Sequence, residues 1–75
     1  MARAGKALKQ VLETYGISQY QLAVAMGVDR SNVSRWVGED RDPVAEAVFE
    51  IKQGLKSINP EAAKDFIRLY LGDDE

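Results

Sequence analysis

The sequence predicts an all-α fold, a compact bundle of five helices. Apolar residues recur at helical spacing along the chain, and no stretch alternates apolar and polar residues with the period of two that a strand requires. Residues that begin and end helices divide this pattern into five segments. A chain of 75 residues is one domain at most, so we expect residues 1–75 to form a single unit with a small core.

The first two segments have clear boundary signals. The first expected helix covers residues 4–15, and Gly16 follows at the position of a left-handed cap. Ser18 and Gln21 have the spacing of a capping box, in which each side chain bonds the backbone N–H of the other. The second helix is therefore expected to begin after Ser18, and it ends at Gly27.

The third and fourth segments also begin with residues that cap helices. Asp29 is the expected N-cap of a helix that ends at Gly38. After a polar turn, Asp42 is the expected N-cap of the fourth helix, with Pro43 at its first position, where the missing N–H of proline does no harm. Its buried stripe is expected to consist of Val44, Val48, Ile51 and Leu55.

The composition excludes several classes of function. The chain has no cysteine and no histidine, so disulfides, thiolate catalysis and zinc-finger sites are impossible. We expect no metal, no cofactor and no catalytic residue, because the core is small and no carboxylates converge. No apolar run is long enough for a membrane helix, and no secretory signal is present, so we expect a cytoplasmic protein without membrane contact.

The charge is distributed unevenly. The net charge is −2, but residues 1–38 carry five basic and two acidic side chains, whereas residues 39–75 carry five basic and ten acidic ones. One end of the molecule is therefore suited to face phosphate while the other faces away.

Residues 19–38 have the features of a helix-turn-helix, two short helices joined by a turn that contains glycine. Ala23 is small where the two helices must cross closely, and Gly27 lies where a positive φ is needed. Val28, Val33 and Trp36 have the spacing that turns one face of the third helix inward. The opposite face then carries Arg30, Ser31, Ser34 and Arg35, side chains suited to base edges and phosphates.

These residues resemble the Xre family of phage Cro and repressor proteins. The resemblance rests on Ser18 to Ala23, Met26 to Val28, Ser31 to Trp36, and Gly38 to Arg41 with Pro43. It covers residues 4–57 and implies a DNA-binding domain of the phage-repressor type that inserts its third helix into the major groove.

The resemblance also implies roles for single residues. Gln19 matches a position that contacts phosphate and supports a recognition side chain, and Arg41 matches a phosphate contact. Arg30, Ser31 and Arg35 match positions that contact bases in the major groove, and Ser34 faces the same groove. The sequence departs from the family in its acidic balance and in Asp29, which we interpret as a helix cap rather than a DNA contact.

Several side chains near the motif have simpler explanations. Arg41 has acidic neighbours with which it could pair, and Lys6 and Lys9 could be ordinary solvated lysines. Trp36 is expected in the core rather than as a stacking platform, and Tyr20 is expected to be exposed. Asn32 points between groove and solvent, so it is the weakest candidate for base contact.

The fifth expected helix covers residues 60–71 after the start signal Asn59-Pro60-Glu61. Its apolar face is broader than a surface helix of a monomer needs. Two interpretations stay open: the face completes the core, or Phe66, Tyr70 and Leu71 are covered by a second copy.

The leading hypothesis from the sequence is a transcriptional regulator, such as a repressor, that binds specific double-stranded DNA as a homodimer. An antitoxin-type regulator that also binds a protein partner through residues 60–71 is a close alternative. A protein-interaction module that has lost DNA binding is a third, favoured by the acidic balance and opposed by Arg30 and Arg35.

Overall fold

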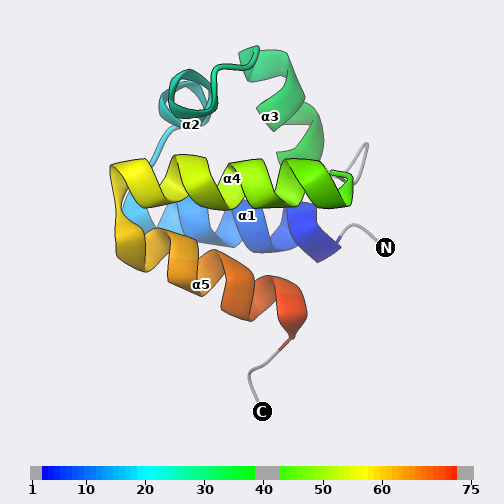
Figure 1. Ribbon diagram of the computed structural model, residues 1–75, viewed down its shortest axis with the longest axis vertical. Helices are drawn as coiled ribbons and strands as arrows, with labels where there is room; N and C mark the ends of the chain where they lie inside the picture. The colour runs from blue at the N-terminus through cyan, green and yellow to red at the C-terminus, as the bar shows by residue number, and fades with distance from the viewer. Residues whose placement is uncertain (1–2, 39–42, 73–75) are drawn as a thin grey trace.

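A computed structural model describes residues 3–38 and 43–72, which form five helices and no strand (Figure 1). The helices are α1 (Arg3–Tyr15), α2 (Gln19–Met26), α3 (Arg30–Val37), α4 (Ala45–Ile58) and α5 (Pro60–Leu71). The all-α prediction and the order of the five helices are confirmed.

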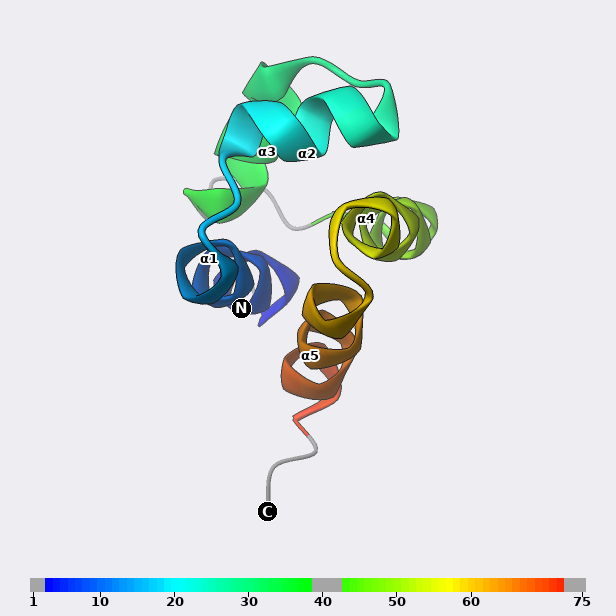
Figure 2. The same ribbon diagram turned by 90° about the vertical axis from the view of Figure 1, so that its left-hand side faces the viewer.

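The helices are stacked in three levels. In Figure 2, α2 and α3 lie together at the top, α1 and α4 lie below them, and α5 lies at the bottom. The packing follows the same order, because α1 contacts α3 and α5, α4 contacts α2 and α5, and α2 contacts α3. The helix-turn-helix is therefore held at the end of the molecule opposite α5.

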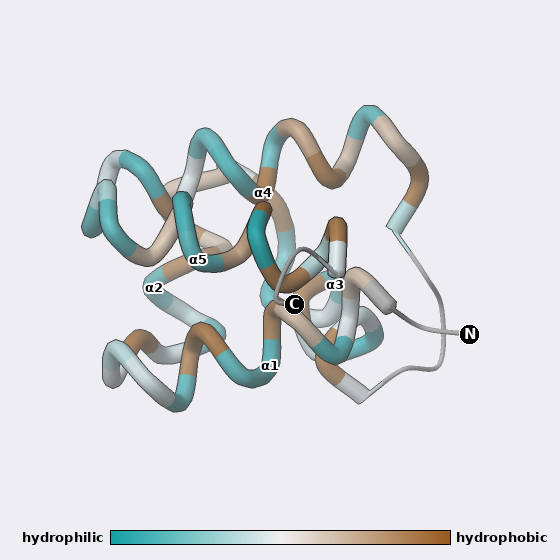
Figure 3. The backbone as a smooth tube through the Cα atoms, turned by 90° about the horizontal axis from the view of Figure 1, so that it is seen from below, coloured by the Kyte–Doolittle hydropathy of each residue, from teal (hydrophilic) through white to brown (hydrophobic). Residues whose placement is uncertain are grey.

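All five helices contribute to one hydrophobic core. Figure 3 shows hydrophobic and hydrophilic residues interleaved along each helix, as expected when each helix turns one face inward. The core contains no buried polar side chain among the described residues. The largest fully buried side chains are Leu8, Val11, Leu22, Val33, Ile51, Leu55 and Phe66.

The predicted caps of α2 and α5 are present. The Gln21 backbone N–H donates to Ser18 Oγ at 3.0 Å, and the Ser18 N–H donates to Gln21 Oε1 at 2.9 Å, which completes the capping box. The Glu61 N–H donates to Asn59 Oδ1 at 3.0 Å, and Pro60 occupies the first turn of α5. Local hydrogen bonding thus fixes both helix starts, as the sequence predicted.

The predicted start of α4 is wrong. The helix begins at Ala45, and its N-cap is Val44, which is extended and makes no side-chain capping bond. Pro43 precedes the helix, and Asp42 lies outside the described residues. Val44 is 70% exposed instead of buried. Because the Val44 side chain is largely exposed, its burial does not stabilise an earlier start of the helix.

The interpretation of Phe66 as part of an intermolecular face is also wrong. Its side chain is fully buried, and its ring stacks on Tyr70 with the ring centroids 6.2 Å apart. Tyr70 is half-buried, and only Leu71 of the predicted trio is well exposed. The part of the apolar face of α5 that includes Ala62, Ala63 and Phe66 therefore serves the core, because α5 packs against both α1 and α4.

Gly54 allows α2 to approach α4 closely. A Cβ atom at this position would lie 2.7 Å from Met26 Cγ and 3.2 Å from Leu22 Cδ1. Both are shorter than ordinary van der Waals contacts, so a side chain at residue 54 would force the Met26 side chain, or α2 with it, to shift. Gly54 therefore helps to position the helix-turn-helix on the rest of the molecule.

Candidate nucleic-acid interface

The turn between α2 and α3 has the conformation that the sequence predicted. Gly27 is left-handed, with φ of 73° and ψ of 32°, and its N–H donates to the carbonyl oxygens of Ala23 and Val24. A Cβ atom at Gly27 would meet nothing within 4 Å, so the backbone conformation alone demands glycine. The Val28 N–H also donates to Ala23 O, at 3.0 Å, which closes the turn.

Two apolar residues anchor α3 to the core. Val33 is fully buried, and Trp36 is 9% exposed, so the prediction that Trp36 belongs to the core is confirmed. Ala23 on α2 is buried where α2 and α3 pack. These contacts fix the rotation of α3 about its axis and thereby decide which of its residues face solvent.

The free face of α3 carries the predicted recognition residues. Arg30, Ser31, Ser34 and Arg35 are all exposed. At 100° per residue they occupy neighbouring positions around the helix, on the side away from Val33 and Trp36. The structure thus brings four of the six predicted site residues onto one surface, which we name the recognition face.

Asn32 contributes in a way that the sequence did not reveal. It is half-buried at the edge of the recognition face, and its Oδ1 accepts a hydrogen bond of 2.9 Å from Arg35 Nη1. The bond spans three residues, the spacing at which side chains on one helix meet. Asn32 therefore orients the Arg35 guanidinium, and its i, i+3 spacing was the sequence signal that could have indicated this.

Asp29 occupies the predicted N-cap position of α3, but its side chain makes no capping hydrogen bond. Its backbone carbonyl accepts from the Asn32 N–H at 3.0 Å, which begins the helix. The expected side-chain cap is thus wrong. The carboxylate is exposed at the start of the recognition helix, where the positive end of the helix dipole offsets its charge.

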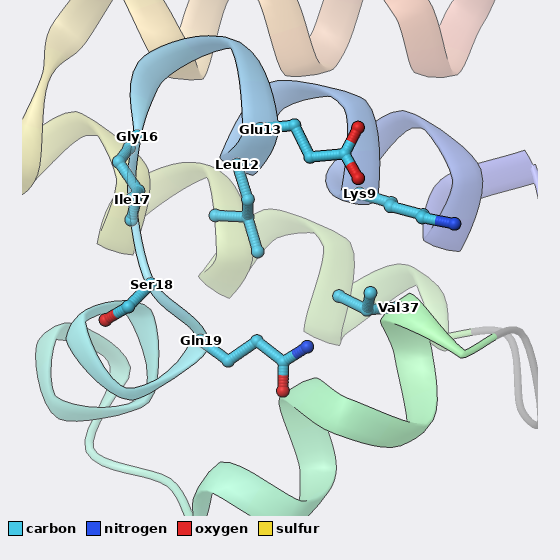
Figure 4. Close-up of a pocket in the computed structure, with 8 residues that line it drawn as sticks. All are labelled: Lys9, Leu12, Glu13, Gly16, Ile17, Ser18, Gln19 and Val37. Carbon is cyan, nitrogen blue, oxygen red and sulfur yellow. The ribbon is translucent and has the colours of Figure 1, made fainter.

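Gln19 lies apart from the recognition face. It is half-buried at the start of α2 and lines an open hollow of about 470 Å³ between α1, α2 and the end of α3. Figure 4 shows Lys9 and Glu13 extending from α1 and Gln19 from α2, with Leu12 and Val37 between them. An amide and an ammonium group that line the same hollow suit a phosphate oxygen, and the Glu13 carboxylate limits this attraction.

Arg41, the sixth predicted site residue, lies outside the described residues. Tyr20 is exposed, as predicted, at 67%. Among the described residues, no group of acidic side chains is placed to hold a metal ion. Within the same residues, no helix is long and apolar enough to cross a membrane.

This geometry defines a class of protein. Two short helices joined by a left-handed glycine, with the second anchored by its apolar face and polar on its free face, are a helix-turn-helix. A helix-turn-helix family model matches residues 8–60, which is more than half of the chain. The chain belongs to the helix-turn-helix family of the Xre/Cro type, a family of DNA-binding regulators. No curated protein and no solved structure matches it.

Proposed function

We propose that this protein is a transcriptional regulator that binds specific sequences of double-stranded DNA, with α3 inserted in the major groove. The observation that carries the proposal is the recognition face, where two guanidinium groups and two hydroxyls stand on the outward side of an anchored helix. Arginine reads guanine through two parallel hydrogen bonds, and short hydroxyls adapt to several base edges. A catalytic role forms no part of this proposal.

Contacts to the DNA backbone are assigned to residues on either side of α3. Gln19 and Lys9 line the same hollow beside α3, and Arg41 follows α3 in the sequence. Such contacts set the position of the helix on the duplex without reading its sequence. In this role the five helices form one DNA-binding domain, and the protein acts on DNA in the cytoplasm.

The proposed active form is a homodimer. One small module buries roughly 600–1,000 Å² on DNA, too little for good discrimination among the competing sites of a genome. A symmetric dimer reads two half-sites, with recognition helices about 34 Å apart along the duplex. We expect the preferred site to be a palindrome for this reason.

Selection from random duplex DNA tests the function directly, because it reports binding, sequence, half-site spacing and symmetry together. Recovered duplexes should share one palindromic site. The logarithm of the DNA-binding constant should fall linearly with the logarithm of the salt concentration, with a slope of about −0.9 for each phosphate neutralised. Arg41→Ala should weaken all sequences alike and flatten that slope by about one. Undetectable binding to every duplex at low salt would refute the proposal.

A protein-interaction role is the second candidate, and one observation favours it. An open groove of about 520 Å³ runs between α4 and α5, with Ile67 and Leu71 among its apolar lining and basic side chains at its rim. A regulator of the antitoxin type would place a protein partner there, whereas a pure interaction module would lack DNA binding. A mobility shift on random duplexes that disappears with added salt separates the two roles.

A further inference from the structure

The exposed side of α4 carries an ordered stripe of four residues. Glu46, Phe49, Gln53 and Lys56 follow one another about one turn apart, and all four are exposed. Phe49 is 57% exposed, a large apolar side chain in the middle of a polar surface. We call these four residues the α4 stripe.

The α4 stripe lies on the solvent side of the helix. Val48, Ile51 and Leu55 turn inward, and at 100° per residue Glu46 and Gln53 fall opposite them, whereas Lys56 falls at the edge of the exposed side. Among the described residues, neither Glu46 nor Lys56 has an ion-pair partner. Within the part of the chain that the structure describes, both charges and the aromatic ring of the stripe therefore face solvent on their outer side.

The order of these residues makes the stripe complementary to itself. An acid, an aromatic ring, an amide and a cation follow one another from Glu46 to Lys56, 10 positions apart, which is about 15 Å of helix. If a second α4 packs against the first in the antiparallel direction and is centred on residue 51, Glu46 faces Lys56 of the other copy. Phe49 then faces Gln53 of the other copy, and the same contacts repeat on the other side of the two-fold axis.

The neighbouring groove adds apolar surface to this contact. Lys52 and Lys56 line the groove between α4 and α5, and Ile67 and Leu71 line it from α5. Lys52 lies one turn after Phe49, so the ring of a second copy would lie beside the stems of both lysines. Aliphatic stems and ammonium groups are favourable neighbours for an aromatic ring.

The symmetry of such a pair also suits the recognition helix. In Figure 2, α4 and α1 lie side by side below α2 and α3, and the outer side of α4 points away from α1. A two-fold axis that runs vertically in this view, beside α4, reverses the direction of α4 but keeps top and bottom. Both copies of α3 would therefore lie at the same side of the dimer, where one duplex could meet them.

We infer that the α4 stripe is a homodimer surface, in which two α4 helices pack antiparallel with Glu46 against Lys56 and Phe49 beside Gln53. This inference rests on the proposed homodimer and names its contact. It moves that contact from α5, where Phe66 belongs to the core, to α4.

Charge reversal at the stripe tests the register, with sedimentation equilibrium from about 1 to 100 µM as the measurement. Glu46→Lys and Lys56→Glu each place like charges together twice in the dimer, and each should weaken the dimer about tenfold. The double variant restores opposite charges and should recover the dimer constant to within about threefold. Glu13→Lys and Lys6→Glu make the same changes at exposed positions of α1 and should leave the dimer constant unchanged.

Phe49→Asp should reduce the mass to that of a monomer while circular dichroism remains helical. A wild-type chain that is monomeric over the whole range would overturn the inference. So would single reversals without effect, a double variant that fails to recover, or a dimer broken by Leu71→Asp and not by Phe49→Asp. Sedimentation needs no DNA, so its result is independent of whether the protein binds a duplex.

Discussion

The Arg35 guanidinium on the recognition face is held by Asn32, whose Oδ1 accepts a hydrogen bond of 2.9 Å from Arg35 Nη1. The bond uses one N–H of the guanidinium, and no other side-chain partner of Arg35 lies among residues 3–38 and 43–72. A side chain fixed before binding loses less conformational entropy when it meets a base, so we expect Asn32 to support the proposed base reading by Arg35 without touching DNA.

Arg35→Ala should weaken binding to the preferred site by about 1–3 kcal/mol and relax specificity at one base pair. Asn32→Ala should relax specificity at the same base pair with a smaller loss, about 0.5–1.5 kcal/mol, because only the orienting bond is removed. Titration of the selected duplex and of its single-base variants measures both effects.

A double-mutant cycle checks that the two residues act together. Once Arg35 is absent, Asn32→Ala should have almost no further effect, so the two losses should not add. Additive losses would show that Asn32 contacts the DNA by itself. Equal effects of Arg35→Ala on specific and random duplexes would show that Arg35 contacts only phosphate.

Gly54→Ala should destabilise the protein although alanine is the better helix former. The added Cβ would lie 2.7 Å from Met26 Cγ, and such overpacking typically costs about 1–3 kcal/mol. Better helix propensity returns at most about 1 kcal/mol. Urea unfolding should show a net loss, whereas Gln53→Ala, at the adjacent exposed position, should change stability by less than about 0.5 kcal/mol. A Gly54→Ala variant more stable than wild type would show that α2 shifts to accommodate the added Cβ at little cost in free energy.

The two phenylalanines should behave oppositely. Phe66 is fully buried, and Phe66→Ala should lower the free energy of unfolding by about 3–5 kcal/mol. Phe49 is exposed in one copy. Phe49→Ala should therefore change the free energy of unfolding by less than about 0.5 kcal/mol when unfolding is measured at concentrations too low for dimers. A large loss for Phe49→Ala under those conditions would contradict the position of α4 in the structure.

Tyr15 links α1 to α5 through a hydrogen bond from its hydroxyl to Asp65 Oδ2, at 2.5 Å. This bond to the carboxylate is the largest cause that raises the pKa of Tyr15 above its ordinary value of 10.0, followed by desolvation and by the negative charge of Asp65. Because the folded state favours the protonated hydroxyl, its contribution to stability is complete below pH 10 and disappears as pH rises through the higher folded pKa.

Tyr15→Phe should therefore lower the thermal midpoint at pH 7, and the difference from wild type should shrink above pH 10 as the tyrosine hydroxyl ionises. Melting curves of both proteins from pH 7 to 11 check this, with Tyr20→Phe as the control for an exposed tyrosine. A difference that stays constant over this range would mean that the hydroxyl does not stabilise the fold.

The sequence by itself determined the five helices, the side-chain caps of α2 and α5, and the helix-turn-helix. These features depend on residues three or four positions apart, such as Ser18 with Gln21, and local spacing controls them directly. The exposed residues of α3 followed as well, because Val33 and Trp36 gave that helix an inner face. The family model over residues 8–60 agrees with this part of the prediction.

Only the tertiary structure decided which apolar residues became core and which remained on the surface. Phe66 and Phe49 are equally apolar, but Phe66 lies where α5 meets α1 and α4, whereas no helix covers Phe49. The same holds for Val44, for the close approach at Gly54, and for Tyr15 and Asp65, which are 50 residues apart in the sequence. Burial depends on what another segment places opposite a side chain, and helical periodicity carries no information about that partner.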